Sequence, residues 1–339
     1  MGSSDTTIQL AHGGGGRLSQ QLIQELLVPA FGPANGVLHD AALLPSPGQT
    51  LAFTTDSYVV RPLFFPGGNI GELAVYGSVN DLAMAGAIPV ALSLGLILEE
   101  GLEMATLERV VQAIRAAADR CNVKVITGDT KVVERGKGDG LFINTSGIGA
   151  VERGLWIHPT AVREGDALLV SGDLGRHGVA ILIAREELGF RSTMESDLAP
   201  LHTTVQELIN EGVELHCLRD LTRGGLTSAA DEIARAAGCT IELEEEAIPV
   251  QLEVRSACNL LGLDPLSMAN EGRMLVICPA SEVDRTLTVL QRQHAAASKI
   301  GTLKAGTDAR NLHPVVLRNS LGILRPLDIG RGERLPRIC

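Results

Sequence analysis

Four consecutive glycines, Gly13 to Gly16, come directly before an apolar pattern that predicts a helix over residues 19–31. Glycine lets a backbone approach an anion closely, and a helix N-terminus offers free N–H groups and partial positive charge. The segment is therefore a candidate phosphate site, although a flexible turn would have the same composition. The chain contains no G-x-x-x-x-G-K-[ST], and Glu152 stands where a third glycine would follow Gly147-Ile-Gly149. This argues against a P-loop NTPase and a Rossmann dehydrogenase.

Three aspartates lie at or near predicted strands. Asp56 follows the apolar run 51–55, Asp129 follows 123–128, and Asp81 lies in Ser78-Val-Asn-Asp81. Ligand sites commonly gather at the ends of strands in α/β folds. Clustered carboxylates without soft ligands favour Mg²⁺ held through a few protein oxygens and substrate phosphates. Each aspartate alone is more simply a turn or cap residue, but three of them with a glycine-rich loop favour the metal.

Other polar positions could act on a phosphate or a proton. Lys131, two residues after Asp129, could neutralise a transferring phosphoryl group, or it could be an ordinary surface lysine. The stretch 219–225 has two arginines and two glycines before a helical pattern, which suits an anion, and Thr222 is predicted to cap that helix. The polar turn 270–273 before a predicted strand could present a carboxylate, Glu271.

The last residue of the chain is a cysteine. Ten extended residues reach roughly 30 Å, so a thiol at Cys339 could move between its own domain and a partner protein. The thiolate is the nucleophilic form, and Arg337 would favour it while the terminal carboxylate opposes it. Prenylation is excluded because no residue follows the cysteine. The simpler alternative is an incidental terminal cysteine.

The elements that must position these residues alternate along the chain. We expect two α/β or α+β domains, at residues 1–152 and 153–327, followed by a flexible tail over 328–339. In the first domain we expect helices at 19–31, 70–85 and 104–121 and strands at 51–55, 58–60, 90–98, 123–127 and 141–150. In the second we expect helices at 179–188, 201–211, 226–237 and 254–261 and strands at 167–171, 240–243, 274–278 and 300–303.

Composition limits the possible functions. The 339 residues carry a formal charge of −11, which repels nucleic acids and anionic membranes, and only nine are Phe, Trp or Tyr, too few for a stacking platform. No apolar run reaches the length of a membrane span. The six cysteines stand singly, without metal-ligand spacing, so we expect a cytoplasmic protein with mostly inert thiols.

The motifs together resemble one known family. The chain is similar to the HypE family of carbamoyl dehydratases of [NiFe]-hydrogenase maturation, within the aminoimidazole-ribonucleotide-synthetase-like (PurM-like) ATP-binding superfamily. The resemblance runs the length of the chain, and its most specific part is the terminal tetrapeptide. It is carried by His12-Gly-Gly-Gly-Gly16, Thr54-Thr-Asp-Ser-Tyr-Val59, Pro62-Leu-Phe-Phe-Pro-Gly-Gly-Asn-Ile-Gly71, Val79-Asn-Asp81, Thr127-Gly-Asp-Thr-Lys-Val-Val133, Phe142-Ile-Asn-Thr145, Arg219-Asp220 with Thr222-Arg-Gly-Gly225, Ala269-Asn-Glu-Gly272 and Pro336-Arg-Ile-Cys339.

The resemblance implies a fold, an activity and partners. It implies a homodimer whose N-terminal domains share a β-barrel, with ATP and Mg²⁺ in clefts there. A HypF-type carbamoyltransferase would load a carbamoyl group onto Cys339, ATP-dependent dehydration would convert it to a thiocyanate, and cyanide would pass to iron on a HypC–HypD-type complex.

The family motifs also suggest roles for individual residues. Asp56, Asp81 and Asp129 would bind Mg²⁺–ATP, with Asp129 and Asn80 counted among the nucleotide-binding residues. Gly13, Gly14, Gly15 and Gly16 would contact phosphate. Lys131 would stabilise the transferring phosphate, and Glu271 is the candidate base.

Two other functions fit the same residues. One is a non-catalytic thiol carrier or scaffold in which the acids are structural caps. The other is an ATP-dependent enzyme that acts on a free small molecule and does not need Cys339.

Overall fold

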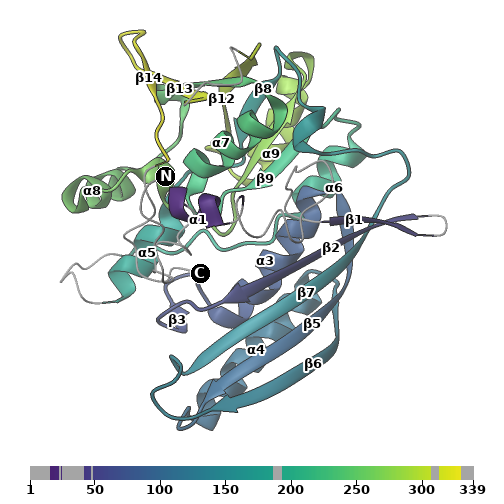
Figure 1. Cartoon of the computed structure of the whole chain (residues 1–339), viewed down its shortest axis with the longest axis vertical. Helices are drawn as coiled ribbons and strands as arrows, with labels where there is room; N and C mark the ends of the chain where they lie inside the picture. The colour runs from purple at the N-terminus through teal and green to yellow at the C-terminus, as the bar shows by residue number, and fades with distance from the viewer. Residues whose placement is uncertain are drawn as a thin grey trace.

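The computed structural model describes residues 16–22, 24, 42–46, 49–185, 193–306 and 313–329. The described chain forms two large β-sheets, one from each half of the sequence, with helix α3 (Ile70–Met84) between the halves (Figure 1). The first sheet has the strand order β1-β2-β7-β5-β6. Its strands are β1 (Ala42–Ser46), β2 (Gln49–Tyr58), β5 (Ala87–Glu99), β6 (Lys124–Val133) and β7 (Leu141–Val151).

The two faces of the first sheet differ. Helix α3 packs on one face, against β2, β5 and β7, and α4 (Met104–Arg120) packs beside α3. Strand β7 alternates strictly, with Ile143 and Thr145 buried under α3 and Asn144 and Ile148 exposed on the opposite face. We call this opposite, uncovered surface the open face. Because alternate side chains point to opposite sides of a strand, residues of the neighbouring strands follow the same division.

The second sheet is covered by helices on both faces. Alternate residues of β11 enter two separate cores, so Leu275 packs toward α7 and Val276 packs toward α6 and α9. A strand buried on both faces is apolar at every position, which is why residues 274–278 form a continuous apolar run. The sheet order is β14-β13-β10-β12-β8-β11-β9. The strands are β8 (Ala167–Val170), β9 (Cys217–Asp220), β10 (Thr240–Glu244), β11 (Met274–Cys278), β12 (Ser298–Lys304), β13 (Val315–Arg318) and β14 (Leu324–Pro326), and the helices are α5 (Arg176–Ala184), α6 (His202–Asn210), α7 (Gly225–Ala237), α8 (Leu252–Leu261) and α9 (Val283–Gln293).

Helix α3 is buried on nearly all sides because it is covered from both directions. One side packs on the first sheet, and the other side contacts β9 and α6 of the second half. A short hairpin of β3 (Phe64–Phe65) and β4 (Gly68–Asn69) precedes it. Asn69 caps the helix by accepting hydrogen bonds from Gly71 N and Glu72 N. A helix that is buried all round fixes the relative position of the two halves.

The expected long elements are present, but two expectations about single residues are wrong. Asp129 does not follow a strand: β6 continues to Val133 because it pairs with β5 over that length. Thr222 does not cap a helix: α7 begins at Gly225 with Gly224 as its N-cap, at φ 75° and with no side-chain cap. The strands β1, β9, β13 and β14 and the helix α9 were not expected.

Other expectations lie partly outside the described residues. Helix α1 (Arg17–Leu22) covers only the start of the predicted helix 19–31. Of the expected tail, only Asp328 and Ile329 are described. Within the described ranges, no helix has both the length and the apolar character required to cross a membrane.

Candidate active site

Two of the expected aspartates lie together in the first half of the chain. Thr54 and Asp56 are two residues apart on β2, so both point to the face of the sheet that α3 covers. Thr54 Oγ1 donates a hydrogen bond of 2.6 Å to Asp81 Oδ2, which comes from α3. The strand and the helix therefore bring Asp56 and Asp81 to one place.

The second half of the chain contributes two more carboxyl groups. Asp220 is the last residue of β9 and lies opposite Met274 of β11, and Glu271 lies in the turn just before β11. Both are buried, and Glu271 is only 3% exposed. We call Asp56, Asp81, Asp220 and Glu271 the acidic centre.

Tyr58 shows that the acidic centre is one electrostatic unit. Its buried side chain lies at the end of β2, against Gly77 of α3. Burial raises the pKa of the Tyr58 hydroxyl well above its usual value, and the nearby charges of Asp56, Asp81 and Glu271 raise it further. Residues from both halves of the chain therefore act on one hydroxyl.

Three carboxyl groups of the acidic centre, those of Asp56, Asp220 and Glu271, hold protons more tightly than ordinary ones. Burial raises the pKa of Glu271 well above its usual value, and the charges of Asp220 and Asp56 add to the effect. Burial likewise raises the pKa of Asp220 to about 6 and raises that of Asp56. Arg223 opposes these shifts at each of the three groups. The centre thus has an excess of negative charge, which a bound cation would relieve.

Glu271 also has unused hydrogen-bonding capacity. Its Oε1 atom is buried and has no hydrogen-bond partner among the described residues. Buried polar atoms are normally paired, and an orphaned one points to a functional role or to a missing partner. A carboxyl with a raised pKa in such a position is a stronger base than an ordinary carboxylate, which suits it to accept a proton.

Asn80 connects the two halves of the chain. Its Nδ2 donates to the carbonyls of Ala199 at 3.1 Å and Glu271 at 3.4 Å, and its Oδ1 accepts from Leu201 N at 2.7 Å. The side chain is 2% exposed. Both amide hydrogens are used within the chain, so Asn80 joins the two halves beside the acidic centre, and its expected nucleotide contact stays a prediction.

Asp129 lies on the other side of the first sheet. It is paired with Gly95, which is paired with Asn144, which is paired with Ser57, so these residues share the open face. Asp56, the neighbour of Ser57, points to the opposite face. Three strand spacings of about 4.8 Å also separate β2 from β6, which is about 14 Å. A single chain does not bring Asp129 to Asp56 and Asp81.

Lys131 accompanies Asp129 on the open face. Its Nζ lies 2.5 Å from Asp129 Oδ2, and both side chains are more than two-thirds exposed. The Lys131 hydrogen bond lowers the pKa of Asp129. The expected phosphate-stabilising lysine is therefore paired with an expected metal ligand on an exposed edge strand, away from Glu271 of the same chain.

Most of the remaining expected site residues are not among the residues that the structure describes. Gly13, Gly14, Gly15 and Cys339 are not among the described residues, whereas Gly16 directly precedes α1. Arg17 Nη2 lies 3.4 Å from Asp328 Oδ1. This contact places the start of the tail beside the end of the glycine-rich segment.

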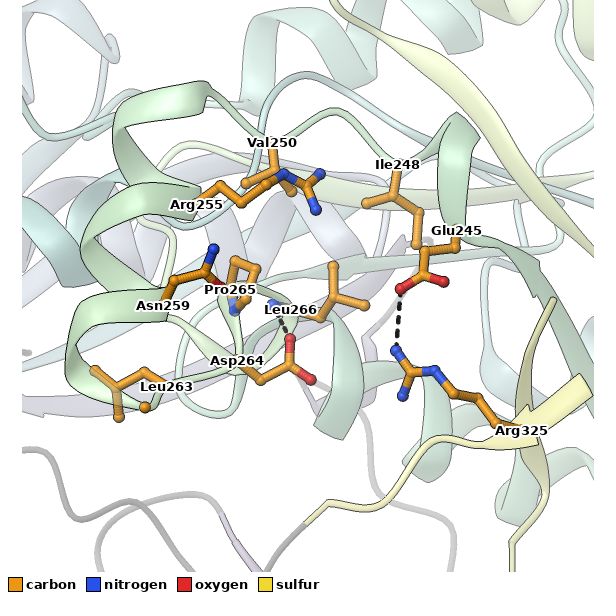
Figure 2. Close-up of a pocket in the computed structure, with 11 residues that line it drawn as sticks. Glu245, Ile248, Val250, Arg255, Asn259, Leu263, Asp264, Pro265, Leu266 and Arg325 are labelled. Carbon is orange, nitrogen blue, oxygen red and sulfur yellow. Dashed lines mark hydrogen bonds and ion pairs between the residues drawn. The ribbon is translucent and has the colours of Figure 1, made fainter. Parts of the chain in front are cut away.

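The second half contains a cavity that is separate from the acidic centre. It measures about 410 Å³ and lies between α8, the turn before it and β14. Figure 2 shows Arg255 and Asp264 on its wall and the ion pair between Glu245 and Arg325 beside it. No lining residue belongs to the acidic centre. Within the described ranges, no three His, Cys, Asp or Glu side chains are arranged to hold a metal ion by themselves.

Sequence reasoning missed the role of Asp220 and Tyr58. The sequence pattern of residues 219–225 predicts an anion site formed by the two arginines, but it does not indicate a role for the carboxyl of Asp220 between them. An aspartate at the end of a short strand gives no sequence signal of burial. The available sequence signals are weak: Arg219 directly precedes Asp220 and Arg223 follows it by three residues, while Tyr58 follows the candidate ligand Asp56 by two residues.

Comparisons with known proteins identify the family. The family model described as "AIR synthase related protein, N-terminal domain" matches residues 38–151, and "AIR synthase related protein, C-terminal domain" matches residues 163–311. The chain is 47% identical to the carbamoyl dehydratase HypE of Azotobacter vinelandii over 338 residues, which is 98% of this chain and 97% of that protein.

Solved structures agree with the sequence comparison. A crystal structure of the hydrogenase maturation protein HypE in complex with ATP is 45% identical, covers 98% of this chain and 100% of that one, and has a TM-score of 0.81. A HypE–HypF complex contains a chain with a TM-score of 0.84 and 39% identity, covering 91% of this chain and 99% of that one. The chain thus has the two-domain PurM-like α/β fold and belongs to the HypE family of carbamoyl dehydratases, which are hydrogenase maturation proteins.

Proposed function

We propose that the chain dehydrates a thiocarbamate carried on its own Cys339 to a thiocyanate, using ATP, and so supplies the cyanide ligand of a hydrogenase iron. The reaction converts R–S–C(=O)–NH₂ and ATP into R–S–C≡N, ADP, phosphate and a proton. The C–O bond breaks and both N–H protons leave as the triple bond forms. The observation that carries the proposal is the acidic centre, in which the buried Oε1 of Glu271 has no hydrogen-bond partner among the described residues and lies near the negative charges of Asp56 and Asp220.

The residues present fit Mg²⁺ and a nucleotide. Mg²⁺ is usually held by one or two carboxylates together with substrate phosphates, and Asp56 and Asp81 offer two carboxylates at one place. A cation would also relieve the raised pKa values of the centre. The N–H groups of Gly13 to Gly16 would contact phosphate. When bound, ATP supplies the phosphoryl group that turns the amide oxygen into a leaving group.

The other residues would move the proton and the substrate. Glu271 would accept an N–H proton at Oε1, since its raised pKa makes it a stronger base than an ordinary carboxylate. Cys339 would carry the carbamoyl group into the site. The contact between Arg17 and Asp328 supports this path, because it starts the tail beside the glycine-rich segment.

A homodimer would give Asp129 and Lys131 a place in the same chemistry. The open face exposes Ile88, Val90 and Ile148 together with the Asp129–Lys131 pair. We propose that two open faces pack together as a shared β-barrel. Asp129 and Lys131 would then reach the nucleotide of the second copy, as a further Mg²⁺ ligand and a phosphate-stabilising cation.

Two partners follow from the chemistry of the tail. A carbamoyl group must be loaded onto Cys339, and we propose a HypF-type carbamoyltransferase for this step, because a relative forms a HypE–HypF complex. The thiocyanate must then be given to iron, and we propose a HypC–HypD-type iron-carrying complex as the acceptor.

Intact-mass measurement tests the proposal. The full chain is incubated with the carbamoyltransferase, carbamoyl phosphate and Mg–ATP. We expect a carbamoyl adduct that loses one water only when ATP is present. Cys339→Ala should form no adduct, whereas Cys258→Ala, which removes a buried thiol, should behave as the original chain.

Other outcomes would support the alternatives. An ATP-hydrolysing Cys339→Ala variant with unchanged turnover of a free amide would favour a small-molecule enzyme. An adduct that never loses water, in a chain that does not turn over ATP, would favour a carrier.

A further inference from the structure

The backbone of Glu271 is held by a segment without regular structure. Residues 193–201, which we call the strap, run between the two halves of the molecule. Ser196 N donates to Pro66 O, just before β4, at 2.9 Å. Three residues later, Ala199 N donates to the carbonyl of Glu271 at 3.3 Å. The strap therefore links the β3–β4 hairpin to the turn that carries Glu271.

Asp197 makes the most direct contact in this link. Its Oδ1 accepts a hydrogen bond of 3.1 Å from Glu271 N. The next residue, Gly272, packs so closely that an added Cβ would lie 2.0 Å from Asp197 O. The N–H of Glu271 thus donates to the Asp197 side chain, and its carbonyl accepts from the strap backbone. The close packing of Gly272 leaves no room for the turn to shift toward the strap.

The position of the Asp197 side chain is itself restricted by its burial beside Arg273. It is completely buried, and its Oδ2 lies 4.0 Å from Arg273 Nε without a hydrogen bond to any described residue. Arg273 is locked against Asp173, with bonds of 2.8 Å to Oδ1 and 3.0 Å to the carbonyl. Burying a carboxylate with so few partners is costly, and stability alone does not explain it.

We propose that Asp197 is a positioning residue, which aims the carboxyl of Glu271 at the substrate by fixing the peptide N–H of that residue. The inference rests on the proposed function, because it needs Glu271 to be the base. A side chain that extends three bonds from Cα magnifies a small rotation of its peptide. A misplacement of 1 Å at a catalytic group can lower a rate about 100-fold.

Two substitutions separate the hydrogen bond from the carboxylate charge. Asp197→Asn retains an oxygen that can accept from Glu271 N, and Asp197→Ala does not. We expect single-turnover loss of water from the carbamoylated chain to fall about 10- to 100-fold in Asp197→Ala. It should stay within about threefold of the original chain in Asp197→Asn. The KM for ATP and the loading of Cys339 should be unchanged in both.

A double mutant shows whether Asp197 acts through Glu271. If it does, Asp197→Ala combined with Glu271→Gln is no slower than Glu271→Gln alone, because residues that act as a unit are not additive. Additive losses would overturn the proposal, as would a normal rate in Asp197→Ala. If Asp197→Ala does not fold by circular dichroism, Asp197→Ser, which cannot reach Glu271 N, takes its place.

The same variants also distinguish a failure of this inference from a failure of the proposed function. A normal dehydration rate in Glu271→Gln removes the base and the positioning role but leaves the dehydratase. Failure to form or dehydrate any adduct in the original chain removes the dehydratase itself. Slow dehydration in Asp197→Asn equal to that in Asp197→Ala overturns the hydrogen-bond explanation.

Discussion

Replacing Asp220 by asparagine should stabilise the folded chain at pH 8. Burial raises the pKa of Asp220 from 3.8 to about 6. Between these values the folded state binds more protons than the unfolded state, so stability falls as pH rises from about 4 to about 6 and is then constant. At about 1.4 kcal/mol per pKa unit, the charged carboxylate costs the folded chain about 3 kcal/mol above pH 6. Asp220→Asn removes that cost and keeps the shape of the side chain.

Urea unfolding at pH 4 and pH 8 measures the effect. We expect a gain in the free energy of unfolding of about 2 to 3 kcal/mol at pH 8 and only about 0.5 kcal/mol at pH 4. Asp231→Asn is the matched control, because Asp231 is buried in the same half but accepts bonds of 2.7 and 3.1 Å from Arg235. That variant should lose about 1 to 3 kcal/mol at pH 8. An Asp220→Asn chain that is equally destabilised at both pH values would refute the electrostatic account of the acidic centre.

Three further variants test separate parts of the site. Lys131→Ala breaks an exposed ion pair with Asp129, so it should change the free energy of unfolding by less than about 1 kcal/mol. It should lower the dehydration rate about 10²- to 10³-fold. An unchanged dehydration rate would exclude the lysine from the reaction. Asn80→Ala removes three hydrogen bonds between the halves and should lower the free energy of unfolding, measured in urea, by about 3 kcal/mol. A loss below about 0.5 kcal/mol would contradict the bridging role of Asn80. Glu271→Gln should slow dehydration about 10²- to 10⁴-fold without affecting loading of Cys339, and a full rate by intact mass would disprove the base.

The parts of the fold that follow from local patterns were predictable. The helix over 104–120 shows its buried stripe directly in the spacing of Val110, Ile114 and Ala118. The continuous apolar run over 274–278 predicts the buried strand directly. In both cases the environment of each residue is set by its own element, so one stretch of sequence contains the information.

The parts that depend on distant pairing were not predictable. Strand β6 extends through Asp129 because β5 lies beside it, and its exposed polar residues give no strand pattern of their own. The register that puts Asp129 and Asp56 on opposite faces involves three neighbouring strand pairs. The sequence predicts one site for all three aspartates, but Asp81 comes from helix α3, and only the structure separates Asp129, on the open face, from Asp56 and Asp81.

The division of the acidic centre between the two halves explains why its charge is tolerated. Asp56 and Asp81 come from the first half and Asp220 and Glu271 from the second, so each half alone buries fewer like charges than the assembled molecule. Docking of the halves through α3 creates the repulsion, and a bound magnesium nucleotide would relieve it. Stabilisation by Mg–ATP should therefore increase as pH rises from 5 to 7, while Asp220 with its pKa of about 6 loses its proton, and it should increase less in Asp220→Asn. A pH-independent stabilisation would mean that the nucleotide binds without neutralising this centre.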